Sequence, residues 1–312
     1  MIIEVQKLTK KFKHQTVLHD IEFNVEEGDV FGYLGPNGAG KTTTMRLLLG
    51  LLKPTSGKAL VFGDYLGANH SLRRRVGVLL ENNGLYERLS ARENLEYYAR
   101  IYSIDNQKSK IDELIQMAGL SGRENDKAGD YSKGMKRKLA LVRALLHNPD
   151  LLFMDEPTSG LDPEAQIMVR DLIVELSRHK GITVFLNSHN LDEVQRICKK
   201  VAILQKGRIK AFDSVSVLRD KLSSPAVQMT FPDYENMQKA IEVLEALDGV
   251  QSCEKDGLTA ILSVKDLQPS VILNKLVGQG ISVDEITKLK KSLEDVYLNI
   301  SQNAGEAEER EE

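Results

Sequence analysis

The chain has 312 residues, of which 41% are hydrophobic and 28% charged, and its formal net charge is −3. This length accommodates one large α/β domain with a substantial core and a second, smaller unit. The near balance of charges excludes the strongly basic surface with which proteins contact nucleic acid, so we expect no nucleic-acid partner.

The first 80 residues alternate short β-rich runs with turn signals. The runs are IIEV, IEFNV, VFGYL, KALVFG and VGVLL, and the turns include EEGD and KPTSG. VFGYL leads into the glycine-rich stretch GPNGAGK, and the apolar periodicity of TTTMRLLLGLL predicts a helix after it. The glycine-rich stretch is therefore predicted to be a loop between a strand and a helix N-terminus.

This loop has the phosphate-binding spacing G-x-x-x-x-G-K-[ST]. Its backbone N–H groups and the positive end of the helix dipole favour a polyphosphate, Lys41 adds a positive charge, and the Thr42 hydroxyl is suited to Mg²⁺. A glycine turn that matches by accident is the alternative, and the strand and helix on either side argue against it. The residues that we expect to hold the nucleotide here are Gly35, Asn37, Gly38, Ala39, Gly40, Lys41, Thr42 and Thr43.

Residues 82–147 are predicted to form a mainly helical subdomain. SARENLEYYARIY and KIDELIQMAGL have apolar residues at helical spacing, and Ser90 with Glu93 forms a capping-box pattern. From about residue 131 helices and strands alternate again, with a helix at GMKRKLALVRALL, a strand at LLFMD, a helix at 163–179 and a strand at GITVFLN. This order predicts a parallel sheet covered on both faces, with a helical insertion.

Two carboxylates follow one another at the end of LLFMD. Asp155 and Glu156 are expected at the carboxyl edge of the sheet, where ligands bind in open α/β folds. Asp155 is suited to hold Mg²⁺, and Glu156 to orient and polarise an attacking water. Two acids that merely end a strand are the alternative, and the PTSGLD that follows Glu156 argues against it.

The composition changes at SSPA, and we place a domain boundary after residue 222. Beyond it the pattern predicts strands at 226–231, 250–256, 258–264 and 281–287 and helices at 234–247 and 268–279. The order βαββαβ predicts a small ferredoxin-like α+β domain over 223–303, with SLEDVYLNIS as a last helix. It has no cluster of His, Asp or Cys, which favours a regulatory or dimer-supporting role. The acidic residues 304–312 are expected to be a disordered tail.

The motifs, in this order and spacing, resemble the ATPase subunits of ABC transporters over residues 1 to about 220. The run that makes the resemblance specific is YSKGM, at the start of a predicted helix. In the family, whose usual pattern is Leu-Ser-Gly-Gly-Gln, this motif binds the γ-phosphate held by a second subunit. The resemblance implies that Ser132 and the Gly134 backbone make this contact, although Tyr131, Lys133 and Met135 depart from the pattern. The fold it implies is a P-loop NTPase of the ABC type.

The resemblance implies roles for four further residues. His189 matches the switch histidine, which contacts the γ-phosphate and helps to position the water, and Asp162 matches the loop that communicates across the dimer. Phe12 matches the aromatic residue on which adenine stacks, with simple packing as the alternative. Glu81 stands where the family has a Gln that ligates Mg²⁺ and senses the membrane partner. A carboxylate can still ligate Mg²⁺, and its charge is expected to slow hydrolysis or to make it depend more on the partner.

The resemblance also implies what the chain does. ATP and Mg²⁺ bind between two ATPase subunits, here expected to be a homodimer, which closes on ATP and parts after hydrolysis. The second partner is an integral membrane permease, so the expected location is the cytoplasmic face of the cell membrane. YSKGM and the C-terminal domain together resemble the ABC-2 type, whose members export drugs or antibiotics, among other cargo. An importer ATPase, and a soluble ATP-dependent resistance or regulatory protein without transport, remain as alternatives.

Two other classes of ATPase fit the sequence less well. Chromosome-maintenance and DNA-repair ATPases separate the phosphate loop from the serine motif by a long coiled coil, whereas the residues between Lys41 and Ser132 show no sustained heptads. Translation factors of the ABC-F kind carry two ATPase domains in one chain, and one is predicted here.

Cysteine usage and apolar runs bear on where the chain works. Cys198 and Cys253 lie far apart without metal or redox spacing, which suits a reducing compartment. No run approaches 18 apolar residues, and the first residues lack the pattern of a secretory signal. We therefore expect the protein to act at a membrane only through another chain.

Overall fold

The computed structural model describes residues 1–13, 15–221, 226–265, 267–289 and 292–297. The chain divides into two compact units, residues 1–215 and 216–312, and each is described by itself. The domain boundary expected after residue 222 stays a prediction.

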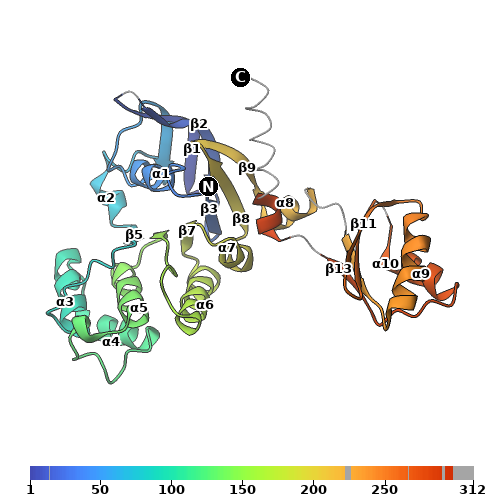
Figure 1. Ribbon diagram of the computed structural model, residues 1–312. Helices are drawn as coiled ribbons and strands as arrows, with labels where there is room; N and C mark the ends of the chain where they lie inside the picture. Colours follow the sequence, from blue (N-terminus) through green and yellow to red (C-terminus); the bar gives the residue numbers. More distant parts are fainter. Residues whose placement is uncertain (14, 222–225, 266, 290–291, 298–312) are drawn as a thin grey trace. The chain divides into compact units, whose positions relative to one another are not determined.

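A six-stranded sheet forms the centre of the first unit, with the strand order β5-β6-β7-β3-β8-β9 (Figure 1). All neighbouring strands are parallel except β8 and β9, which pair antiparallel. Every residue of β3, β6 and β7 is buried, which is why the sequences of these strands are mainly apolar. The strands are β3 (Val30–Leu34), β5 (Val76–Leu79), β6 (Leu151–Asp155), β7 (Thr183–Ser188), β8 (Lys200–Gln205) and β9 (Arg208–Ser214).

A second, antiparallel sheet with the order β2-β1-β4 covers one face of the central sheet together with α1. Its strands are β1 (Ile3–Phe12), β2 (Gln15–Val25) and β4 (Ser56–Val61), and α1 is Lys41–Leu48. Stacked rings join the two sheets, with the centroids of Phe23 and Phe31 5.6 Å apart. The β-rich runs of the first 80 residues were predicted without this separate sheet, because periodicity gives strands but not their partners.

Helices cover the opposite face of the central sheet. They are α5 (Lys133–Ala144), α6 (Pro163–Lys180) and α7 (Leu191–Ile197), which contact β5, β3 and β7. Helix α7 lies directly on β3, because a Cβ at Gly32 would stand 2.7 Å from Val194 Cγ1 and 3.1 Å from Cys198 Sγ. The expected covering of both faces is therefore present, with a sheet and one helix on one side and helices on the other.

The predicted helical subdomain contains α3 (Ala91–Tyr102) and α4 (Gln107–Met117), which pack on each other and on α5. The capping box is present, because Glu93 N–H donates to Ser90 Oγ at 3.1 Å and Ser90 N–H donates to Glu93 Oε2 at 2.7 Å. Shorter elements of the first unit are α2 (His70–Arg73) and a 3-10 turn at Ala128–Asp130.

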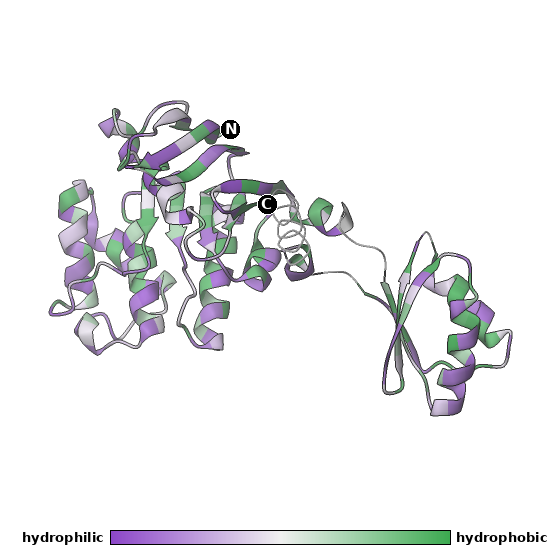
Figure 2. Cartoon of the chain, turned by 45° about the horizontal axis from the view of Figure 1, so that its top comes forward, coloured by the Kyte–Doolittle hydropathy of each residue, from purple (hydrophilic) through white to green (hydrophobic). Residues whose placement is uncertain are grey.

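In the second unit, four antiparallel strands in the order β11-β12-β10-β13 carry two helices (Figure 1). The elements are β10 (Ala226–Thr230), α9 (Tyr234–Glu245), β11 (Val250–Asp256), β12 (Thr259–Val264), α10 (Pro269–Val277) and β13 (Glu285–Leu289), and α8 (Val215–Lys221) precedes them. This order fits the ferredoxin-like prediction. The core consists of apolar side chains from both helices and the sheet, and Figure 2 shows the hydrophobic residues alternating with polar ones along these elements.

The strand predicted at 281–287 begins later and occupies Glu285–Leu289. The residues before it bond elsewhere, because Ile281 N–H donates to Leu276 O at 3.1 Å and Ser282 N–H to Asn236 Oδ1 at 2.9 Å. Of the last predicted helix, residues 293–297 are helical, and the rest lies outside the described residues. The expected disordered tail at 304–312 also lies outside them.

Candidate functional site

The glycine-rich loop joins β3 to α1, as predicted, and its glycines meet two different demands. Gly38 and Gly40 have φ angles of 80° and 112°, a left-handed backbone that favours glycine. Gly35 is required by packing instead, because a Cβ there would lie 2.3 Å from the carbonyl oxygen of Leu204 in β8. The loop therefore packs against β8 at Gly35, and it has a left-handed backbone at Gly38 and Gly40.

Lys41, the first residue of α1, is 7% exposed. Its ammonium donates to the Gly35 carbonyl at 2.6 Å and lies 3.9 Å from Glu156 Oε1. Burial lowers the pKa of Lys41, and the nearby carboxylates of Glu156 and Asp155 oppose that shift. A buried cation thus lies beside a loop whose backbone N–H groups and helix end favour an anion.

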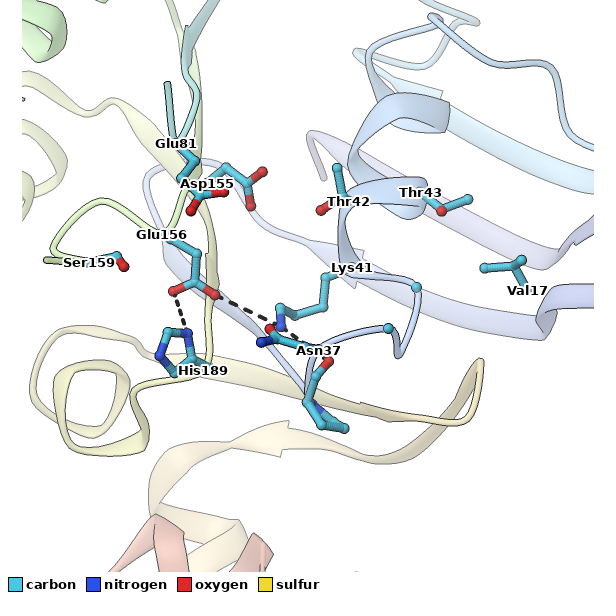
Figure 3. Close-up of a pocket in the computed structure, with 13 residues that line it drawn as sticks. Val17, Asn37, Lys41, Thr42, Thr43, Glu81, Asp155, Glu156, Ser159 and His189 are labelled. Carbon is cyan, nitrogen blue, oxygen red and sulfur yellow. Dashed lines mark hydrogen bonds and ion pairs between the residues drawn. The ribbon is translucent and has the colours of Figure 1, made fainter. Parts of the chain in front are cut away.

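Glu156 follows β6 in a strained backbone conformation with a φ of 48°, which costs a non-glycine residue about 1–2 kcal/mol. Its N–H donates to the Asn187 carbonyl at 3.0 Å, and its Oε2 lies 2.9 Å from Nδ1 of His189 (Figure 3). The carboxylate therefore lies between the Lys41 ammonium and the His189 imidazole. Strain of this kind is held by its surroundings and is typical of functional sites.

Oxygen donors gather beside this group. Asp155, Glu81 and Thr42 line the same cleft, and Figure 3 shows the Thr42 hydroxyl directed toward the side where the two carboxylates lie. Asn187 Nδ2 donates to Asp155 Oδ1 at 3.1 Å, which fixes the orientation of that carboxylate. Carboxylate and hydroxyl oxygens are the ligands that Mg²⁺ prefers, so the donor set fits this ion. In the part of the chain that the structure describes, no group of three or more His, Cys, Asp or Glu side chains is placed to hold a metal alone, so phosphate or water oxygens must complete the shell.

These residues line one cleft of about 520 Å³. The predicted site residues that it contains are Asn37, Gly38, Gly40, Lys41, Thr42, Thr43, Glu81, Asp155, Glu156 and His189. Val17, Pro36 and Ser159 line it as well and were not predicted. Val17 gave no signal in the sequence, since an apolar residue in a strand is ordinary, whereas Pro36 and Ser159 lie inside the two motifs.

Six predicted residues do not line this cleft. Gly35 and Ala39 belong to the loop behind it, and Phe12 lies at the end of β1, 42% exposed, with the Lys10 ammonium 4.8 Å from its ring centroid. Ser132 is exposed at the start of α5, where its Oγ accepts from Met135 N–H at 3.2 Å. Asp162 caps α6 by accepting from Ala165 N–H at 2.8 Å. Gly134 lies against this cap, because a Cβ there would stand 2.9 Å from Ala165 Cβ.

Buried polar side chains behind the cleft were not predicted. Glu193 of α7 is 2% exposed and its Oε2 accepts from the hydroxyls of Thr158 at 2.8 Å and Ser188 at 3.3 Å. Burial raises the pKa of Glu193, although these two hydrogen bonds oppose the shift. Arg137 of α5 is 4% exposed, and burial lowers its pKa to about 10 against the attraction of nearby carboxylates. Asn187 was detectable in the sequence as a polar residue in an apolar strand.

Comparison with known proteins assigns the family. The family model described as "ABC transporter" matches residues 18–159. The bacitracin transport ATP-binding protein BcrA of Bacillus licheniformis is 38% identical over 303 residues, which is 96% of this chain and 97% of that protein. This chain belongs to the ATP-binding proteins of ABC transporters.

Two further similarities agree with this. The Nod factor export ATP-binding protein I of Rhizobium sp. (strain N33) is 34% identical over 303 residues, and the match covers 96% of each chain. A solved structure of the ATP-binding subunit of an ABC transporter is 32% identical, with a TM-score of 0.64, over 71% of this chain and 93% of that one. As an ABC ATPase the protein binds and hydrolyses ATP. Within the described residues of this ABC ATPase, none of the helices has the length and apolar character of a membrane span.

Proposed function

We propose that this ABC ATPase powers export across a membrane through a separate integral membrane permease, with ATP and Mg²⁺ bound in the cleft around Lys41. The observation that carries the chemical part is the meeting of Lys41, Asp155, Glu156 and His189 in one cleft. The relatives named for bacitracin transport and for Nod factor export support the direction.

Nucleotide binding is assigned to the loop and to α1. The left-handed backbone at Gly38 and Gly40 surrounds the phosphates, Lys41 supplies the charge, and Phe12 stacks on adenine. Gly35 contributes indirectly, since its carbonyl holds the Lys41 ammonium. Asn37, Ala39 and Thr43 complete the loop and the first turn.

Hydrolysis is assigned to Glu156 and His189. A mostly enclosed carboxylate 2.9 Å from a nitrogen of an exposed imidazole can orient a water and accept its proton. Thr42, Asp155 and Glu81 are the residues that hold Mg²⁺. Bound there, the ion neutralises charge on the phosphates.

The second half of each site is assigned to another copy of the chain. Ser132 does not line the Lys41 cleft and its side chain is exposed, so it is free to meet a nucleotide on a second subunit. The Gly134 backbone lies next to it, and Asp162 caps the helix against which Gly134 packs. Two copies related by a two-fold axis then enclose two nucleotides, and hydrolysis lets them part.

The permease is assigned to the surface beside Glu81. Leu80, Tyr86, Tyr97 and Ile101 are exposed there or on α3, and the rings of Tyr86 and Tyr97 lie 4.8 Å apart. Aromatic side chains of this kind are favoured in protein interfaces. Attachment through this surface places the subunit at the cytoplasmic face of the cell membrane.

The chemical part is tested with Glu156→Gln. We expect it to retain ATP binding, to lose turnover at least about a hundredfold, and to accumulate a dimer in Mg-ATP. Glu175→Gln on the exposed side of α6 is the matched control and keeps wild-type turnover. Wild-type turnover in Glu156→Gln would contradict the role of Glu156, and a monomer at saturating Mg-ATP would contradict the dimer.

The transport part is tested by membrane pelleting with and without the candidate permease. The transporter subunit sediments with membranes only when the permease is present. A protein that never pellets, yet hydrolyses ATP, is the soluble regulatory alternative. ATP-driven uptake of cargo into inverted vesicles indicates an exporter, and ATP-driven loss of preloaded cargo indicates an importer.

A further inference from the structure

Arg137 makes an unusual set of hydrogen bonds for a residue of a helix. In the second turn of α5, it is buried and reaches the backbone of two different segments behind the cleft. The Nε donates to the Pro157 carbonyl at 2.7 Å, and Nη2 donates to the carbonyls of Asp155 and Glu156, both at 2.8 Å. One guanidinium therefore holds three successive carbonyls at the end of β6.

The other end of the same guanidinium holds the loop after β5. Nη1 donates to the Leu80 carbonyl at 2.5 Å, to Asn83 Oδ1 at 3.1 Å and more distantly to the Glu81 carbonyl at 3.4 Å. The planar guanidinium presents its N–H groups in a fixed fork, so it joins the two segments at a set distance. Lysine has no such fork.

The segment that Arg137 holds contains the strained residue of the site. Glu156 has a left-handed backbone, and its N–H and carbonyl are bonded to the Asn187 carbonyl and to Arg137 respectively. Strained residues persist when their surroundings determine them on both sides. Releasing the carbonyl side lets the peptide after Glu156 relax, which moves its carboxylate relative to Lys41 and His189.

We propose that Arg137 is a positioning residue for hydrolysis, which holds the backbone of Glu156 in its strained conformation and ties it to the loop that carries Glu81. This inference rests on the proposed role of Glu156. It makes α5, the helix that Ser132 caps, the element whose position sets the geometry of the Glu156 carboxylate. Arg137 does not line the cleft, so it acts on turnover and not on nucleotide affinity.

Arg137 can hold the backbone carbonyls through its guanidinium, or it can only balance nearby negative charge. These two roles predict different results for Arg137→Lys. Asp155, Glu81, Glu193 and Glu156 all act electrostatically on Arg137, so a cation at this position also balances buried negative charge. Lysine keeps the charge and loses the fork. If position 137 serves only to balance charge, Arg137→Lys retains turnover, and if it serves to hold the carbonyls, Arg137→Lys loses it.

The experiment compares Arg137→Lys and Arg137→Gln with Arg143→Lys in the full chain. Arg143, on the same helix, also donates to a backbone carbonyl, that of Gly84 at 2.8 Å, and none of its hydrogen bonds reaches residues 155–157. Equilibrium binding of ATP counts the sites in each preparation, and turnover is expressed per site. Partial misfolding removes sites and turnover together, so the ratio reports the positioning role alone.

We expect both Arg137 variants to lose at least tenfold in turnover per site while their ATP affinity changes less than threefold. The turnover per site of Arg143→Lys should stay within twofold of wild type. Turnover per site within twofold of wild type in Arg137→Lys overturns the inference, and so does an equal loss in Arg143→Lys. Glu156→Gln is measured beside them. If it remains active, the proposed function fails, whereas an inactive Glu156→Gln beside an active Arg137→Lys rejects only the role of Arg137.

Discussion

The two units of the chain differ in where they place polar side chains. Buried polar or charged residues of the described chain all lie in the first unit, between Asp29 and Glu193. The described non-glycine residues with a positive φ also all lie in the first unit, and Glu156 is one of them. The core of the second unit is apolar, with Val227, Leu262 and Ile272 fully buried.

The cleft around Lys41 lies in the unit that holds these buried polar side chains and positive-φ residues. Burying a polar group or straining the backbone costs stability, and Lys41, Asp155 and Glu156 combine one of these features with a place in the cleft. The second unit follows the ordinary rules of an amphipathic sheet covered by helices. We therefore expect changes in the two units to have separable effects.

The largest effect on ATP binding is expected for Lys41→Ala. Removing the cation leaves Asp155 and Glu156 unbalanced beside the phosphate loop, and ATP affinity should fall at least about a hundredfold, or about 3 kcal/mol. Equilibrium binding measures this, with the exposed Lys58→Ala of β4 as the control. An ATP affinity within threefold of wild type would show that this cleft is not the ATP-binding site.

The next prediction concerns the stability of the second unit, residues 216–312. Leu262→Ala in β12 creates a cavity in a fully buried site and should destabilise this unit by about 2–5 kcal/mol. Hydrogen exchange of β10–β13 should accelerate while ATP affinity stays at the wild-type value. The exposed Lys255→Ala is the control. A parallel loss of ATP affinity would show that the two units do not act separately.

A smaller effect, dependent on pH, is expected for Glu193→Gln. Burial raises the folded-state pKa of Glu193, so above the unfolded pKa of about 4.3 the native state binds more protons than the unfolded state, and stability falls as pH rises. Glutamine does not titrate, and its carbonyl oxygen can accept from Thr158. Urea unfolding should find the variant more stable relative to wild type at pH 8 than at pH 4.5. If the stability difference between Glu193→Gln and wild type is the same at both pH values, the raised pKa of Glu193 is contradicted.

The smallest effect is expected for Ser90→Ala. It removes the Oγ that accepts from Glu93 N–H and should cost about 1 kcal/mol of stability in the helical subdomain. Basal ATP turnover should not change, because the cap lies outside the cleft. Ser109→Ala on the exposed face of α4 is the control and should cost less than half as much.

Local sequence patterns predicted much of the fold and the cleft. LLFMD matched β6 at both ends, and the loop from Gly35 to Lys41 lies between a strand and a helix as expected. These features were accessible because strand, loop and helix signals are local in sequence. The strand predicted at 281 was misplaced because its first residues bond to two helices, which is a tertiary effect.

The residues behind the cleft were not predictable in the same way. Arg137 stands in the run KRK, which in a sequence is typical of a solvated helix face, and its carbonyl partners lie 18 to 57 residues away. Glu193 is likewise buried only because α7 packs on β3. Gly35 was predicted for its approach to phosphate, and the structure shows its approach to Leu204.

The contact at Gly32 limits which parts of the first unit can shift against each other. With no room for even a methyl group between β3 and α7, the strand that leads to Lys41 and the helix that follows His189 form one stiff body. We therefore expect Lys41 and His189 to keep their relative position when the cleft opens or closes. The expected site of movement is the opposite side of the cleft, where the loop of Glu81 leads to α3.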